Sequence, residues 1–167
     1  MNKKYALISL IVIATAILVA LIVVGVTKEP VDVKPDVSSV NGEVTLKSQE
    51  GNYSVNVTAV YDTMPLTSVT EFPSAERVAV VVYEYTNDDI AHGLSIGNTH
   101  FKAYDSNGKE LEQFPQEGLF EAGEVGAEGT FTASVAFALN NDKNYIKVEF
   151  YNDTASDKPD AVFEKNW

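Results

Sequence analysis

The stretch RVAVVVYEYTN, residues Arg77–Asn87, decides the fold. After Arg77 it is apolar at five consecutive positions, Val78 to Val82, and polar side chains follow. A strand that is apolar on both faces is typical of the interior of a sheet that other parts of the chain cover. The sequence therefore predicts a central β-strand here, and the neighbouring segments must supply the rest of the sheet.

The segments on either side show the two-residue period of half-buried strands. Upstream, residues 52–62 alternate, which places one set of apolar side chains on a single face: Tyr53, Val55, Val57, Ala59 and Tyr61. Downstream, a hairpin signal at Asn107-Gly108 separates two short strands. Alternating strands follow at 130–139 and 145–151, and a final edge strand is expected at 161–167.

Short strands joined by turns, without sustained helical spacing, favour an all-β fold. We expect an antiparallel β-sandwich, with a small barrel as the alternative. The segments 63–76, 88–98 and 115–128 contain proline, glycine or many charged residues and are interpreted as loops.

Residues 5–26, YALISLIVIATAILVALIVVGV, contain no charge. At about 1.5 Å per helical residue, this segment is long enough to cross a hydrocarbon core of roughly 30 Å. Lys3 and Lys4 precede it, which favours a cytoplasmic N-terminus. We therefore predict a single N-terminal transmembrane helix that acts as a signal-anchor. The alternative is a secretory signal that is cleaved off, and both interpretations export the rest of the chain.

This interpretation divides the chain into four parts. Residues 1–4 form a cytoplasmic tip, 5–26 the membrane segment and 27–43 an extended linker that contains two prolines. Residues 44–167 form the β-sandwich domain. The predicted location is the cell membrane, with the C-terminal domain outside; cleavage of the signal would instead give a secreted protein.

Composition excludes several classes of function. The chain has no cysteine, which excludes disulfides, lipidation on cysteine and thiolate metal sites. It has 24 acidic and 12 basic residues and a formal net charge of −12, and such a surface repels nucleic acid. The expected partners are the membrane, through residues 5–26, and an envelope protein, a cell-wall polymer or a host surface.

Three segments carry a resemblance to a known family: the strand VVVYEYTN at 80–87, the hairpin FKAYDSNGKEL at 101–111, and GEVGAEG at 123–129. Together they resemble immunoglobulin-like domains of unknown function in exported proteins of Gram-positive bacteria. That family is similar to a mycobacterial secreted immunogenic antigen. The resemblance covers about residues 44–153 and implies an immunoglobulin-like fold and export, but no catalytic residues.

The sequence GLSIG at 93–97 matches the G-x-S-x-G nucleophile pattern, and His92 and His100 flank it. The pattern normally lies on a turn between a strand and a helix, with the acid and then the histidine far downstream. Here a strand follows and His100 is close in sequence. A small serine hydrolase at Ser95 is therefore kept only as an alternative, and we expect no enzyme activity.

Two further patterns suggest metals. His92 and His100 could bind a metal with Asp88 or Asp89, but their spacing matches no known ligand pattern. The run DSNGKE at 105–110 is similar to the start of a calcium loop, yet it places lysine and glutamate where an EF-hand needs an oxygen ligand and a glycine. We therefore expect no metal and no cofactor.

The most biased part of the domain is 110–128, which has six glutamates and no lysine or arginine. An interaction loop is predicted here, with Glu117, Glu121, Glu124 and Glu128 as its candidate residues. The sequence thus indicates a membrane-anchored, extracellular β-sandwich that acts as a binding module. The alternative of a different kind is a structural accessory domain within a membrane complex.

Overall fold

The computed structural model describes residues 42–67 and 75–167. The predicted membrane segment 5–26, nearly all of the linker 27–43 and part of the loop 63–76 lie outside the described residues. In the described part, the chain forms strands and one short 3-10 helix in this order: β1 (Val44–Lys47), β2 (Asn52–Thr63), β3 (Arg77–Asn87), η1 (Asn98–His100), β4 (Phe101–Tyr104), β5 (Glu110–Leu111), β6 (Gly129–Leu139), β7 (Tyr145–Phe150) and β8 (Ala161–Asn166). In the described part of the chain, no helix has both the length and the apolar character needed to span a membrane.

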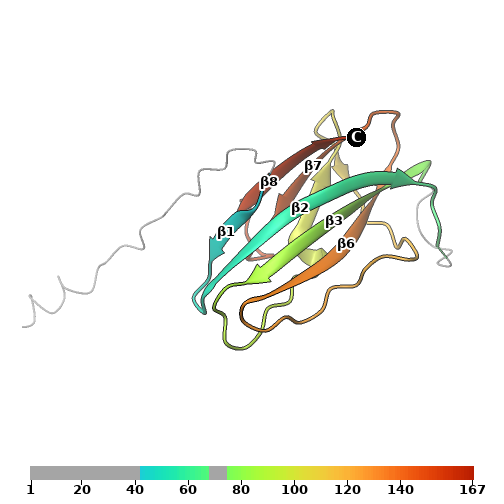
Figure 1. Ribbon diagram of the computed structural model, residues 1–167. Coiled ribbons are helices and arrows are strands. Elements are labelled where there is room, and N and C mark those ends of the chain that lie inside the picture. Colours follow the sequence, from blue (N-terminus) through green and yellow to red (C-terminus); the bar gives the residue numbers. More distant parts are fainter. Residues whose placement is uncertain (1–41, 68–74) are drawn as a thin grey trace, which may run out of the picture. The chain divides into compact units, whose positions relative to one another are not determined.

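The strands form two separate antiparallel sheets (Figure 1). The first has the order β1-β2-β3-β6 and the second the order β5-β4-β7-β8. The chain changes sheet three times, after β3, after β5 and after β6. The all-β prediction is confirmed, and the arrangement is that of a β-sandwich rather than a closed barrel.

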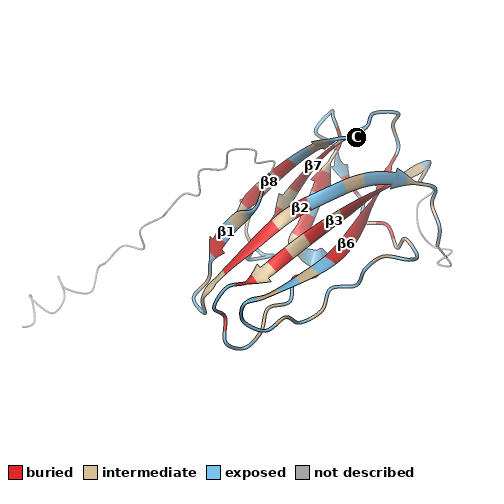
Figure 2. Cartoon of the chain, in the orientation of Figure 1, coloured by how far each residue is buried: buried red, intermediate tan, exposed pale blue. Residues whose placement is uncertain are grey.

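Strand β3 lies between β2 and β6, as its sequence predicts. On its inner face Ala79, Val81 and the tyrosines after them join the main core between the sheets. On its outer face Val78 and Val80 are also buried, because Phe114 from a loop covers them. Figure 2 shows β3 as buried along most of its length.

The predicted alternation of β2 is wrong in its second half. The register between β2 and β3 shifts between Val57 and Ala59, which is a β-bulge at Thr58. The extra residue reverses the facing of the following side chains, so Val60 packs against the core. Ala59 and Tyr61, which were expected to point inward, are exposed instead.

The hairpin between β4 and β5 is closed by Asp105, which is buried. Its Oδ1 accepts hydrogen bonds from the backbone N–H groups of Asn107 (2.8 Å) and Lys109 (2.9 Å), and its Oδ2 accepts one from the Asn141 amide (3.1 Å). These bonds, led by the one from Lys109, hold the pKa of the Asp105 carboxyl below its ordinary value. The carboxylate that opens the calcium-like sequence thus organises the turn.

We expect Asp105→Ala to lower the free energy of unfolding by about 2 kcal/mol near neutral pH, since three N–H donors lose a charged acceptor. The folded pKa of Asp105 lies below the unfolded value of about 3.9, so this contribution is present above that pH. It is lost as the pH falls through the folded pKa. Urea unfolding of both proteins at a series of pH values measures the difference.

Asp157→Ala is the matched control, because Asp157 is exposed and makes none of the hydrogen bonds found in the described part of the chain. Its unfolding free energy should stay close to that of the parent protein at every pH. Equal losses in the two variants would contradict the role assigned to Asp105.

Candidate functional site

The acidic loop 112–128 follows the free edge of β6. The backbone N–H of Phe114 donates to the carbonyl of Ala136, and that of Ala138 donates to the carbonyl of Glu112, both at 2.8 Å. Further along, the N–H of Ser134 donates to the carbonyl of Phe120 at 2.9 Å. The loop therefore shields an edge that would otherwise be open to pairing with another chain.

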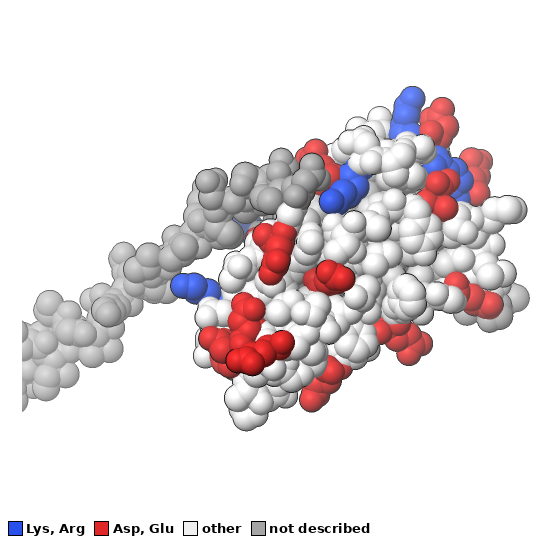
Figure 3. Space-filling view, viewed as in Figure 1, with Lys and Arg blue, Asp and Glu red and all other residues white. Residues whose placement is uncertain are grey.

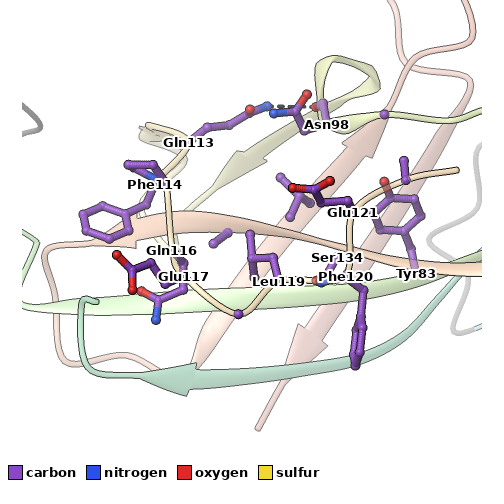
Figure 4. Close-up of a pocket in the computed structure, with 16 residues that line it drawn as sticks. Tyr83, Asn98, Gln113, Phe114, Gln116, Glu117, Leu119, Phe120, Glu121 and Ser134 are labelled. Carbon is purple, nitrogen blue, oxygen red and sulfur yellow. Dashed lines mark hydrogen bonds between the residues drawn. The ribbon is translucent and has the colours of Figure 1, made fainter. Parts of the chain in front are cut away.

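Between these contacts the loop arches away from β6 and leaves a groove of about 590 Å³ (Figure 4). Its walls are largely apolar, with Phe114, Leu119 and Phe120 from the loop and Ala136 from β6. Polar side chains at the groove include three amides and two carboxylates: Asn98, Gln113, Gln116, Glu117 and Glu121. None of the lining residues is a lysine or an arginine, so the groove favours cationic groups.

Alternate residues of β3 hold the loops around this groove by side-chain hydrogen bonds to the loop backbones. The buried Tyr83 donates its hydroxyl to the carbonyl of Ile96 at 2.8 Å, which holds the loop 88–100. The hydroxyl of Tyr85 donates to the carbonyl of Gly123 and accepts from the N–H of Gly123 at 3.1 Å. Burial raises the pKa of the Tyr83 phenol, which keeps it a donor.

Asn87 is the third fastening residue, and it is fully buried. Its amide nitrogen donates to the carbonyls of Ile90 (2.9 Å) and Val125 (3.1 Å), while its oxygen accepts from the N–H of Ile90 (2.7 Å). Val125 is also paired with Leu94 through two backbone hydrogen bonds of 2.9 Å. One side chain thus joins two loops that lie far apart in sequence.

Gly123 is required by close packing. A Cβ built at this position would lie 2.7 Å from the ring of Phe131, which itself stacks on Tyr85 at 5.7 Å between ring centroids. The glycine lets the loop approach the sheet closely enough for the hydroxyl of Tyr85 to reach it.

An exposed apolar face lies beside the groove. We define it by the four large apolar side chains that are exposed in the described part of the chain, Tyr61 (48%), Met64 (81%), Leu66 (58%) and Phe120 (61%). Leu66 is bonded to the acidic loop, since its carbonyl accepts from the N–H of Glu117 at 2.8 Å and its N–H donates to Gln116 at 2.9 Å.

The sheet register relates Tyr61 to the part of β6 that Phe120 contacts. Tyr61 pairs with Val80 of β3, which in turn pairs with Ala136 of β6. Two residues further along β3, Val82 pairs with Ser134, and the Ser134 hydroxyl accepts a hydrogen bond from the backbone N–H of Phe120. Figure 3 shows the outer side of the first sheet as mostly uncharged, with acidic groups scattered over it and along its edges and cations mainly at one end. The apolar face and the groove therefore adjoin each other at Phe120, which belongs to both.

The outer face of the second sheet has a different character. The Glu149 carboxylate accepts hydrogen bonds from Lys147 and from the hydroxyl of Tyr151, both at 2.7 Å. Burial opposes ionisation of Glu149, but these two donors hold the pKa of its carboxyl below the ordinary value. Lys147 also lies over the ring of Tyr104, 4.3 Å from its centroid. The charges of Lys147 and Glu149 on this face are therefore already paired with each other.

The four glutamates predicted as an interaction loop are not brought together. Glu117 and Glu121 line the groove. Glu124 lies at the end of the sandwich, close against Gly93: a Cβ added to that glycine would be 2.8 Å from the Glu124 side chain. Glu128 occupies a left-handed turn position (φ 63°) before β6, and its N–H donates to the carbonyl of Asn87 at 2.6 Å.

Ser95 and His100 line one small cavity at the same end of the sandwich, whereas His92 is exposed outside it. The Nδ1 of His100 lies 2.8 Å from the backbone carbonyl of Tyr151 and is not held by a carboxylate. Among the described residues, no hydrogen bond links Ser95 to a histidine. Residues 42–67 and 75–167 also contain no cluster of three potential metal ligands of the histidine, cysteine or acidic types.

Sequence comparison identifies no matching protein-family model and no matching curated protein. In structure, the chain is similar to YcdA of Bacillus subtilis, which is classed as a lipoprotein, with a TM-score of 0.55 and 14% identity over 75% of this chain and 39% of YcdA. It is also similar to MPT63, a secreted protein of Mycobacterium tuberculosis, with a TM-score of 0.57 and 13% identity over 80% of this chain and 99% of MPT63.

At these identities the comparisons establish a shared fold. They confirm the predicted similarity to a mycobacterial secreted protein at the level of architecture. The predicted membership of a Gram-positive family stays a prediction.

We expect Tyr85→Phe to loosen the acidic loop and to lower the unfolding free energy by about 1 kcal/mol, because Gly123 loses its hydroxyl partner. Native-state hydrogen exchange should become faster at the amides of Val125 and Leu94. Thr86→Val is the control: it removes a neighbouring hydroxyl that bonds Thr130 on the exposed face. Unchanged exchange at Val125 in the Tyr85 variant would contradict the fastening role.

Proposed function

We propose that this chain is a membrane-anchored, immunoglobulin-like domain that lies outside the cytoplasm and binds a protein partner. The strand order supports the fold assignment, since β2-β3-β6 and β5-β4-β7-β8 correspond to strands A-B-E and C′-C-F-G of an immunoglobulin sandwich. The secreted and lipoprotein neighbours support export. Residues 5–26 supply the anchor in this proposal.

The observation that carries the proposal is the apolar face beside the acidic groove. Large exposed apolar side chains that gather on one side of a domain are typical of protein interaction surfaces. Phe120 and Tyr61 are aromatic, and aromatic side chains are enriched among the residues that dominate binding energy. The groove next to them is lined by Glu117 and Glu121 without a compensating cation.

This combination specifies the chemistry of the partner. We infer a protein segment that presents apolar side chains next to lysine or arginine. The apolar groups would cover Tyr61 and Phe120, and a cation would enter the groove. The second sheet is a poorer candidate, because Lys147 and Glu149 already neutralise each other on its outer face.

Binding is favoured over catalysis by the surroundings of Ser95. A serine nucleophile needs a base that can take its proton, and the base needs a group that orients it. His100 is oriented by a backbone carbonyl, and no hydrogen bond connects it to Ser95 in the part of the chain that the structure describes.

The surface can be tested by site-specific photocrosslinking of the full-length protein in its native membrane. A benzophenone side chain is placed at Tyr61, at Phe120 or at the exposed Lys109 of the β4–β5 turn, which serves as the control. We expect the same adduct mass from the first two positions and none from Lys109. The double variant Glu117→Lys, Glu121→Lys should lose the adduct, because two cations then repel the basic partner.

The outcomes separate the two candidate functions. Equal adducts from all three positions would indicate a domain packed within a complex, which is the structural accessory alternative. No adduct from Tyr61 or Phe120 would contradict the proposed binding surface.

The anchor has its own test, which is the intact mass of the protein after cell fractionation. A full-length mass in the membrane fraction is expected, since residues 5–26 exceed the usual length of about 7–15 residues for the apolar part of a cleaved signal. A protein found in the medium without about its first 25 residues would instead establish a secreted form.

A further inference from the structure

A second cavity, of about 240 Å³, lies at the end of the sandwich where Asn87 and Val125 meet. We call it the end cavity. Four parts of the chain form it: the turn after β1, the start of β2, the loop after β3, and the end of β7. Its floor is apolar and rigid, because Ile90, Ile96 and Phe150 are all buried.

The rim of the end cavity carries a histidine with a defined tautomer. The Nδ1 of His100 lies 2.8 Å from the carbonyl oxygen of Tyr151, and a carbonyl can only accept a hydrogen bond. Nδ1 therefore carries the proton, and the neutral ring keeps Nε2 as an acceptor. Stacking on Phe150, with ring centroids 5.9 Å apart, fixes the plane of the imidazole.

Two more rim groups have no hydrogen-bond partner among the described residues, the Ser95 hydroxyl and the Glu50 carboxylate. The neighbouring polar groups are already engaged. Tyr53 donates to Asn152 at 2.7 Å, and Ser48 donates to Gly51 at 3.0 Å.

The unengaged groups of the rim are thus mainly acceptors. One of them, Glu50, is charged, and no lysine or arginine lines the cavity. A ligand that matches this rim must donate hydrogen bonds and carry positive charge, while the apolar floor accommodates a short hydrocarbon part.

We propose that the end cavity binds a small organic ammonium group, such as the amine of a short alkyl chain. The ammonium donates to Glu50, to Nε2 of His100 and to the hydroxyl of Ser95, and the alkyl part lies over Ile90 and Ile96. This site is separate from the apolar face and does not depend on the partner proposed above.

The isoleucines provide the probe for a test on the full-length protein in detergent. Outside residues 5–26 the chain has only Ile90, Ile96 and Ile146, and the first two line the cavity. With the isoleucine δ1-methyl groups labelled, butylammonium chloride is titrated by NMR in mildly alkaline buffer. We expect saturable shifts of Ile90 and Ile96 and a constant signal from Ile146, which lies in the core.

Two variants separate a specific site from general attraction to an acidic domain. Glu50→Gln should weaken binding of butylammonium about tenfold, as the loss of one charge-assisted hydrogen bond requires. Asp157→Asn, which removes a charge from the loop after β7 without touching the cavity, should leave it unchanged. Neutral butanol should bind about as weakly to the parent protein as butylammonium binds to Glu50→Gln.

Three results would overturn the proposal. The first is a titration in which Ile90 and Ile96 do not shift or shift without saturation. The second is equal weakening by Glu50→Gln and Asp157→Asn, which would indicate general electrostatic attraction. The third is equal affinity for butanol and butylammonium, which would indicate an apolar cavity that does not recognise the ammonium group.

Discussion

The structure depends on one row of inward-facing side chains on β3, namely Tyr83, Tyr85 and Asn87. The two tyrosine rings pack in the core, and Asn87 is buried beside them. The polar group of each side chain donates a hydrogen bond to a backbone carbonyl of a loop. Because buried backbone groups must be paired, these three side chains determine where the loops 88–100 and 112–128 lie against the sandwich. The groove and the end cavity are both bounded by these loops, so both sites depend on the same row.

Much of this architecture is readable from the sequence. The central strand, the Asn107-Gly108 hairpin and the strands at β6, β7 and β8 follow from apolar period and turn chemistry, which are local properties. The short strand β1 cannot be predicted in this way, because its four residues are too few to show an alternating pattern. The candidate site was located only in part: Glu117 and Glu121 line the groove, but the exposure of Tyr61 and the role of Phe120 depend on contacts between distant segments.

The two outer faces of the sandwich explain why one side is suited to binding. On the second sheet, Lys147, Glu149 and Tyr151 satisfy one another, so a partner would have to replace existing interactions there. On the side of the first sheet, Tyr61 of β2 and Phe120 of the acidic loop remain exposed to water without such neighbours, and covering them is favourable in itself. The end cavity adds a site of a third kind, since its unengaged groups are acceptors around an apolar floor.

The exposed position of Tyr61 depends on a one-residue insertion in β2, the bulge at Thr58. Tyr61 faces outward because one additional residue interrupts the alternation of β2. The gain or loss of a single codon therefore exchanges the inner and outer sides of half a strand at once, which no single substitution can do. In related domains, binding surfaces on this sheet can thus arise or disappear through insertions and deletions, and each such change also replaces the side chains that this half of β2 presents to the core.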